Sequence, residues 1–143
     1  MIRQEFMVED YGWHVTAYYA VTTYYADEIV PELYWIGCRG RALSDAGDNL
    51  TESRLNTGLT YSNLRDRETV MVIALTSTAE EFAKSWRHEM GHLAAHIAQA
   101  DGISPYGEEI QYIGDAIVGE MWPVARKFLC DCCRRKLMFN SKQ

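Results

Sequence analysis

Three residues in the middle of the chain have the types and the spacing of a metal-binding catalytic site. His88, Glu89 and His92 form the pattern H-E-x-x-H inside residues 77–100. On an α-helix, residues i and i+4 lie on the same face, about 6 Å apart along the axis, so two imidazoles can converge on one ion. Imidazole nitrogens are preferred ligands of zinc. The pattern therefore predicts a Zn²⁺ site held by His88 and His92.

Glu89 has the position of a general base rather than that of a ligand. It lies about 100° around the helix from His88, close enough to contact a water molecule on the metal. Zinc lowers the pKa of such a water to about 7, and the carboxylate can then take its proton and later hand it to the leaving amine. The three residues together predict hydrolysis, most often of a peptide bond.

The residues around the motif predict the helix that must carry it. Thr78, followed three residues later by Glu81, has the pattern of a capping box at a helix start. Apolar residues then recur at helical spacing and predict one buried stripe. They are Phe82, Trp86, Met90, Leu93 and Ile97. The two motif histidines lie on another face of this helix, so we expect them to remain accessible.

A zinc hydrolase needs a third protein ligand, and the next predicted helix offers two carboxylates. Glu108 and Glu109 follow His92 after a loop short enough to fold that helix back alongside. Glu109 is preferred because it lies nearer the Ile113 face, which must pack inward. Glu108 is the close alternative, with Tyr112 four residues later available to orient a histidine. If neither binds metal, both acids stabilise a helix N-terminus.

His96 cannot complete the same site, although it shares the helix face of His92. Eight residues separate it from His88, which is a rise of about 12 Å, whereas bonds from zinc to nitrogen are about 2.1 Å long. We therefore expect His96 to lie beside the site and to donate a hydrogen bond to a bound substrate.

Length and charge exclude several other classes of function. The chain has 143 residues, which suits one domain with a modest core, and a formal net charge of −6. Nucleic acids and anionic membranes bind basic surfaces, so neither is expected as a partner. Acidic residues stand where a secretory signal needs an apolar segment, and no apolar run is long enough to cross a bilayer. We therefore expect a cytoplasmic protein.

The end of the chain carries most of the cysteines. Cys130, Cys132 and Cys133 crowd into four residues, and this spacing suits neither a disulfide framework nor a C-x-x-C metal site. Free cytoplasmic thiols are the simpler interpretation, and a second metal site that also includes Cys38 is the weaker one. Residues 137–143 are expected to be frayed.

The pattern along the chain predicts a small α+β domain over residues 1–143. Strands are expected at 5–8, 13–22, 55–63 and 69–76. Helices are expected at 23–36, 41–52 and 77–100, and a further helix is expected from Pro105. Pro31 predicts a kink or a late start in the first helix, and Trp122-Pro123 predicts an interruption of the last. The strand at 69–76 is almost continuously apolar, which predicts a central strand covered on both faces. We therefore expect a short mixed or antiparallel sheet packed against the motif helix and the following glutamate-bearing helix.

A strand, then an H-E-x-x-H helix, then a second helix with a glutamate resembles a gluzincin-type zincin in minimal form. Residues 56–63, 88–92 and 107–112 look like the small metallopeptidase-like proteins of bacterial phages and mobile elements. The resemblance covers roughly the second half of the chain. It implies a zincin-like fold and a peptide or protein substrate whose backbone binds an edge strand at Gly58, Thr60 and Tyr61. It also implies a tyrosine or histidine that stabilises the oxyanion, for which Tyr61, Tyr106 and Tyr112 are alternatives.

Two functions from different classes are consistent with these residues. The first is zinc-dependent hydrolysis of peptide bonds, with Glu89 as the base. The second is a binding or regulatory module of a phage or mobile element that keeps the zincin fold without turnover. The presence of Glu89 favours the enzyme, because a module that only binds metal does not need this carboxylate.

Overall fold

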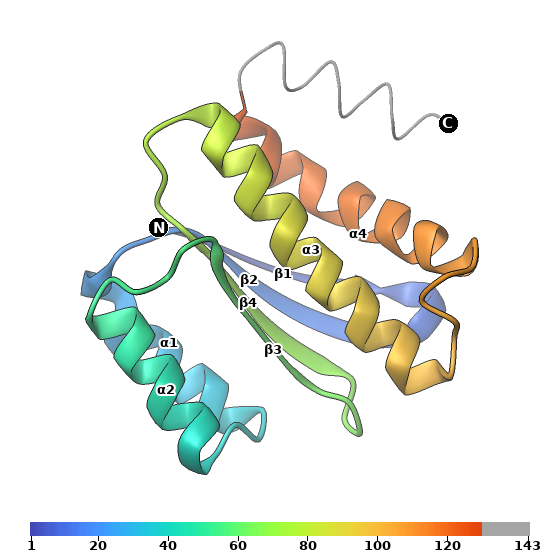
Figure 1. Ribbon diagram of the computed structural model, residues 1–143, viewed down its shortest axis with the longest axis horizontal. Helices are drawn as coiled ribbons and strands as arrows, with labels where there is room; N and C mark the ends of the chain where they lie inside the picture. The colour runs from blue at the N-terminus through green and yellow to red at the C-terminus, as the bar shows by residue number, and fades with distance from the viewer. Residues whose placement is uncertain (130–143) are drawn as a thin grey trace.

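A mixed four-stranded sheet forms the centre of the molecule in this computed structural model, which describes residues 1–129 (Figure 1). The strands are β1 (Ile2–Val8), β2 (Trp13–Val21), β3 (Gly58–Asn63) and β4 (Glu68–Ala74), in the order β1-β2-β4-β3. β1 is antiparallel to β2, β2 is parallel to β4, and β3 is antiparallel to β4. The predicted α+β class with a mixed sheet is therefore confirmed.

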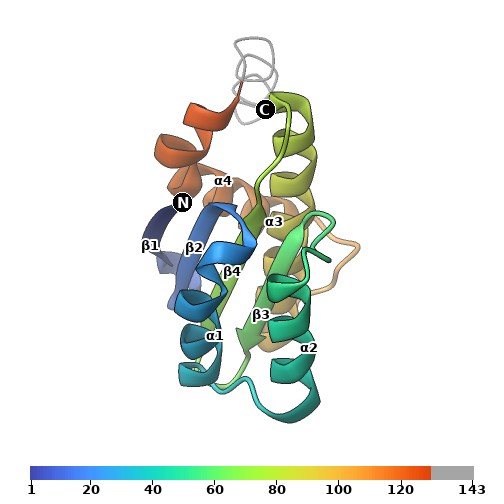
Figure 2. The same ribbon diagram turned by 90° about the vertical axis from the view of Figure 1, so that its left-hand side faces the viewer.

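Helices cover both faces of this sheet, as the two perpendicular views show (Figures 1 and 2). The helices are α1 (Ala26–Trp35), α2 (Gly40–Thr51), α3 (Ala79–Asp101) and α4 (Glu109–Ala125). α1 and α2 lie on one face, and α3 and α4 lie on the other. Short 3-10 turns at Glu9–Tyr11, Thr23–Tyr25 and Arg126–Phe128 complete the structure. α1 starts at Ala26, after the second of these turns, and carries Pro31 inside it, so the helix does not start late at this proline.

β4 is the central strand, as its apolar sequence predicts. It lies between β2 and β3, and its side chains alternate between two buried clusters. Met71 and Ile73 pack beneath α3 and α4, whereas Val70 and Val72 pack beneath α1 and α2. α3 begins five residues after β4 ends, so a strand that is buried on both faces positions the motif helix.

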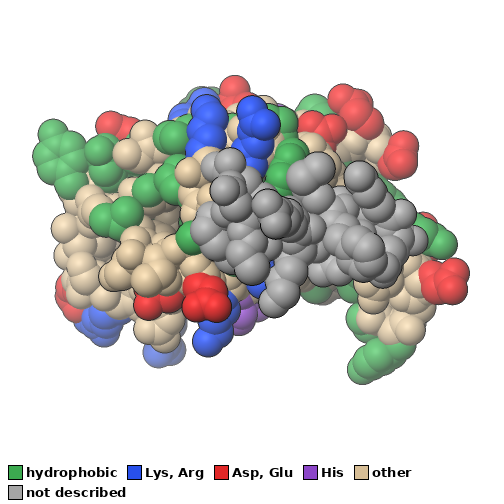
Figure 3. All heavy atoms as spheres, turned by 90° about the horizontal axis from the view of Figure 1, so that it is seen from above, with side chains coloured by type: hydrophobic (Ala, Val, Ile, Leu, Met, Phe, Trp, Pro, Cys, Tyr) green, Lys and Arg blue, Asp and Glu red, His purple; other side chains and the backbone are tan. Residues whose placement is uncertain are grey.

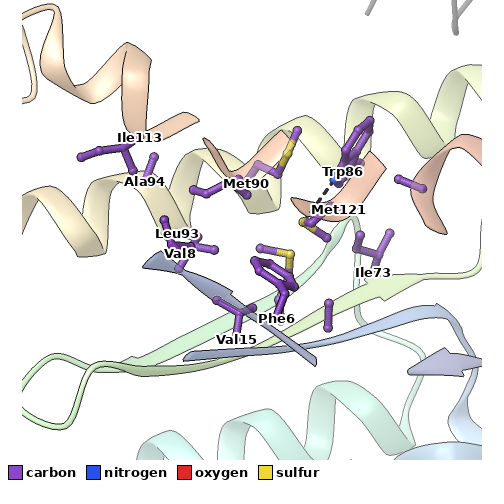
Figure 4. Packing of buried hydrophobic residues seen from close by; sticks show 14 of the residues in the cluster. Phe6, Val8, Val15, Ile73, Trp86, Met90, Leu93, Ala94, Ile113 and Met121 are labelled. Atoms are coloured by element: carbon purple, nitrogen blue, oxygen red, sulfur yellow. Dashed lines mark hydrogen bonds between the residues drawn. The ribbon is translucent and has the colours of Figure 1, made fainter. Parts of the chain in front are cut away.

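The main core lies between the sheet and the pair α3 and α4. Figure 4 shows Trp86 and Met90 of α3 above Phe6 and Val15 of the sheet. Met121 of α4 joins the same cluster, and its sulfur accepts a hydrogen bond from Nε1 of Trp86 at 3.4 Å. All five members of the predicted apolar stripe of α3 are buried. The packing therefore fixes which face of α3 points away from the core.

The ends of α3 follow the sequence signals closely. The Thr78 hydroxyl accepts a hydrogen bond from the Glu81 backbone N–H at 3.1 Å, and the Glu81 carboxylate accepts one from the Ser77 N–H at 3.2 Å. The reciprocal bond of the capping box therefore goes to the residue before the N-cap. Gly102 ends the helix in the left-handed conformation, with φ 67°. The predicted start and end of α3 are confirmed.

α4 differs from its prediction at two points. It begins at Glu109 rather than at Pro105, because Ser104 starts only a single turn in which Gly107 donates to its carbonyl and Tyr106 donates to its hydroxyl. It also continues through Pro123 without interruption. A proline removes one backbone hydrogen bond, and the buried stripe continues on both sides of it at Ile117, Met121 and Ala125. Packing of this stripe maintains the helix.

The surface and the end of the chain add two observations. On the face seen in Figure 3, outside the grey atoms, basic and acidic side chains both occur around the rim. No helix among residues 1–129 is long and apolar enough to cross a membrane. Cys38 is buried and free. The predictions for Cys130, Cys132, Cys133 and the frayed tail lie outside the described residues.

Candidate metal and catalytic site

The two motif histidines lie side by side on the outer surface of α3. Both side chains are exposed, and their Nε2 atoms are 3.2 Å apart. The rings of His88 and His92 meet edge to face, with centroids 4.8 Å apart and an interplanar angle of 82°. The i and i+4 spacing on a regular helix accounts for this approach. The predicted convergence of the two imidazoles is therefore present in the fold.

The separation of these nitrogens fits two ligands of one tetrahedral ion. Two bonds of about 2.05 Å that meet at the tetrahedral angle place the ligand atoms about 3.3 Å apart. The 3.2 Å between the Nε2 atoms of His88 and His92 is close to this value. In the absence of an ion, the same distance suits an N–H···N hydrogen bond between neutral rings. His88 and His92 can therefore supply two of the ligands of zinc.

The side chain of Glu89 points from α3 toward the edge strand β3. Its residue surface is only 2 % exposed, although His88 beside it is exposed. The Thr57 hydroxyl donates to Oε2 at 2.6 Å, and the Thr60 hydroxyl donates to Oε1 at 2.8 Å. Both carboxylate oxygens are thus held from the β3 side, about 100° around α3 from His88.

The alternation of β3 explains which of its residues reach α3. Thr60 and Ser62 point toward α3, whereas Leu59 and Tyr61 pack against the core beneath α1 and α2. A β-carbon on Gly58 would lie 3.2 Å from Cγ of Glu89 and 1.9 Å from the Val72 carbonyl oxygen. The absence of a side chain at this position therefore lets the two elements approach closely.

The structure separates the predicted substrate-binding residues. Gly58 and Thr60 lie against Glu89. Tyr61 faces the opposite side of the sheet, where burial raises the pKa of its hydroxyl. Tyr112 and Tyr106 are exposed, Tyr112 on α4 and Tyr106 in the loop before that helix. Only Gly58 and Thr60 are thus brought next to a motif residue.

A second polar contact joins β3 to α3 one turn beyond His92. Nδ1 of His96 lies 2.6 Å from the Ser62 hydroxyl oxygen. Ser62 is in turn 2.7 Å from the Thr69 hydroxyl, which accepts a hydrogen bond from Nε1 of Trp13 at 2.8 Å. Burial, and then the nearby charge of His92, lower the pKa of His96. The chain of hydroxyls holds the orientation of this ring.

We call the contacts of Thr57, Thr60 and Ser62 with Glu89 and His96 the α3–β3 seam. Sequence reasoning missed Thr57 and Ser62 as partners of the motif helix. The only signal was the run of hydroxyl residues in 57–62, and its meaning depends on which face of the strand meets α3. The seam therefore required the tertiary structure.

β3 is one of the two edge strands of the sheet that residues 1–129 form, and its open edge lies beside the motif helix. The Thr57 carbonyl accepts a hydrogen bond from the Ala74 N–H at 3.2 Å, which makes these two residues a hydrogen-bonded antiparallel pair. Alternate residues then pair with β4, so the N–H and C=O groups of Thr60 and Ser62 face the free edge. Such groups can bind an extended peptide.

Glu108 and Glu109 lie away from the two histidines. Asp101 at the end of α3 is nine residues beyond His92, which is about 13 Å along the axis. α4 starts only after the loop that follows Asp101, and Glu109 is close enough to Tyr11 for its charge to raise the pKa of that hydroxyl, after the larger effect of burial. Among residues 1–129, no group of three or more His, Cys, Asp or Glu side chains could hold a metal ion.

The packing of α4 explains this separation. Trp86 of α3 contacts Met121 of α4. His88 is two residues after Trp86, so its side chain is rotated by about 200° around the axis of α3 from that of Trp86. His88 therefore points about 160° away from the side of α3 that α4 covers. The structure brings His88 and His92 together, but it brings neither predicted glutamate to them.

We expect Glu109→Ala and Glu108→Ala to change zinc affinity by less than about twofold, because neither carboxylate lies beside the histidines. His96→Ala should likewise preserve zinc affinity. Competition with a chromophoric zinc chelator measures all three variants. A loss of about tenfold or more in Glu109→Ala would instead establish the ligand that the sequence register favours.

Comparison with protein-family models, curated proteins and solved structures finds no match to this chain. The function of the site is therefore inferred from its geometry and chemistry.

Proposed function

We propose that this chain is a zinc-dependent peptide hydrolase with a zincin-like H-E-x-x-H helix, acting in the cytoplasm on a peptide or protein and related to phage or mobile-element proteins. The observation that carries the proposal is the 3.2 Å separation of Nε2 of His88 and Nε2 of His92 on an exposed helix face. Glu89, adjacent in sequence to His88, supplies the carboxylate that this chemistry needs.

Each residue has a defined task in the proposed reaction. Zinc held by His88 and His92 would polarise the scissile carbonyl and make a water molecule more acidic. Glu89 accepts a proton from the attacking water at one carboxylate oxygen and then transfers it to the nitrogen of the leaving amine. The carbon–nitrogen bond breaks and the amine departs neutral, while the water oxygen keeps its second hydrogen in the new carboxylic acid, which then loses this proton to solvent.

The open edge of β3 supports a peptide as the substrate. Main-chain groups of Thr60 and Ser62 face this edge, next to the side chain of Glu89. An extended substrate that pairs with these groups has its backbone beside the motif helix. The side chains of the substrate then alternate between the two faces of the extended sheet.

A second candidate function is a metal-binding regulatory module without turnover. It is favoured by the burial of Glu89, whose two oxygens already accept hydrogen bonds from Thr57 and Thr60. In this reading the carboxylate ties α3 to β3, and the histidine pair binds metal for a structural or regulatory purpose.

Metal analysis of protein purified without chelator tests both functions at once. We expect about one zinc per chain and cleavage of fluorescein-labelled casein that stops with a chelator and returns with added zinc. One zinc without cleavage favours the regulatory module. No zinc after loading with excess metal contradicts both functions.

A further inference from the structure

The carboxylate of Glu89 is held by the hydroxyls of Thr57, which precedes β3, and of Thr60 in β3. Oε2 accepts from Thr57 at 2.6 Å, and Oε1 accepts from Thr60 at 2.8 Å. Transfer of a carboxylate from water into a protein interior is costly unless hydrogen bonds replace its hydration. Among residues 1–129, no buried side-chain nitrogen or oxygen lacks a partner. The two threonines therefore provide the hydrogen bonds that allow Glu89 to be buried.

Two donors restrict a carboxylate more than one donor does. A single bond leaves the group free to rotate about its last side-chain torsion, and this torsion is intrinsically broad. Bonds to both oxygens fix the plane of the carboxylate as well as its position. Gly58 stands between the two threonines and leaves space for Cγ of Glu89. The segment Thr57 to Thr60 is thus shaped to hold this side chain.

We propose that Thr57 and Thr60 are positioning residues for Glu89, the general base of this protein. This role rests on the hydrolase function proposed above. Each hydroxyl occupies one lone pair of a different oxygen, so each oxygen keeps a second lone pair for a proton. The proton from the attacking water is received there while the two threonine bonds remain in place. The edge strand that faces the substrate also fixes the base, so one element aligns both.

A purely structural role for the two threonines makes a different prediction. If they only tie α3 to β3, their loss lowers stability and leaves turnover of the folded protein unchanged. If they position Glu89, their loss lowers kcat in protein that is folded and binds zinc. Replacement by valine removes the hydroxyl with little change in shape, and replacement by serine retains it.

The test therefore compares Thr60→Val, Thr57→Val and Thr60→Ser with the wild-type chain. Thr16→Val is the matched control, because Thr16 is also a buried strand threonine, and it does not contact Glu89. Zinc content, kcat and KM on fluorescein-labelled casein are measured for each variant. Urea unfolding of the metal-free variants gives a readout that does not depend on activity.

We expect Thr60→Val to bind one zinc and to lower kcat at least tenfold, with KM changed less than about twofold. Thr57→Val should behave in the same way, and Thr60→Ser should recover kcat to within about threefold of wild type. Thr16→Val should lower stability only. In the Glu89→Gln background, Thr60→Val should cause no further loss of activity. The factor by which Thr60→Val changes the unfolding equilibrium constant should be at least threefold smaller in that background than in the wild-type chain.

Three results would overturn the proposal. The first is an unchanged kcat in Thr60→Val and Thr57→Val while the stability effects of Thr60→Val and Glu89→Gln remain non-additive, which assigns the threonines a structural role alone. An equal loss of kcat in Thr16→Val shows a general effect of destabilisation. Zinc-loaded wild-type protein that cleaves nothing removes the hydrolase function itself, and this outcome is distinct because it is seen before any threonine is changed.

Discussion

His88→Ala and His92→Ala are each expected to abolish stoichiometric zinc binding, with the metal content falling from about one to below about 0.1 ion per chain. Each variant removes one of the two nitrogens that lie 3.2 Å apart, and the remaining imidazole alone is a weak ligand. Both side chains are exposed, so the free energy of unfolding of the metal-free protein should change by less than about 0.5 kcal/mol. Metal analysis after gel filtration, together with urea unfolding, measures both quantities.

His14→Ala provides a matched control for this prediction. His14 lies in β2, with its Nε2 3.6 Å from a carboxylate oxygen of Glu5, and it is not part of the histidine pair. We expect this variant to bind zinc like the wild-type chain. Retention of one tightly bound zinc in both His88→Ala and His92→Ala would place the metal elsewhere and refute the site.

Glu89→Gln is expected to lower the rate of peptide hydrolysis by about 10²–10⁴-fold while zinc binding is retained. The amide cannot accept the proton of the attacking water, and Glu89 is not one of the two imidazole ligands. Its carbonyl oxygen can still accept a hydrogen bond from one threonine hydroxyl. The free energy of unfolding should therefore fall by only about 1–2 kcal/mol. Cleavage of labelled casein at equal zinc occupancy measures the effect.

The outcome of Glu89→Gln also separates the two candidate functions. Loss of cleavage with zinc retained supports the hydrolase. Full activity in this variant would show that the carboxylate is not the base. A large loss of stability, in a protein whose wild-type chain shows no cleavage, supports the regulatory module in which Glu89 ties α3 to β3.

The histidine pair follows from local geometry, and for this reason the sequence was sufficient to predict it. His88 and His92 are four residues apart on one helix, and the capping signal at Thr78 defines the start of that helix. The helical period alone then brings the two imidazoles together. The apolar run of β4 likewise predicted a central strand, because burial on both faces requires apolar side chains on both.

The α4 residues show where sequence patterns were insufficient. Helical periodicity identified the buried face of α4, but it could not show on which side of α3 that helix would pack. The contact of Trp86 with Met121 shows that α4 packs on the side of α3 away from His88, and α4 begins only after the loop that follows Asp101. The continuation of α4 through Pro123 has the same cause, since packing of its buried stripe outweighs the local signal.

The sequence by itself determined the position of the motif helix, its accessible histidine pair and the central strand of a mixed sheet. Only the tertiary structure decided what surrounds Glu89, because Thr57 and Thr60 are about thirty residues away along the chain. Thr60 contacts Glu89 because β3 occupies a sheet edge next to α3 and turns alternate side chains toward it, whereas Thr57 contacts it from the position just before β3. Strand order and register depend on contacts between residues far apart in the sequence. They place β3 against the motif helix, so that the Glu89 carboxylate is buried beside the edge of the sheet.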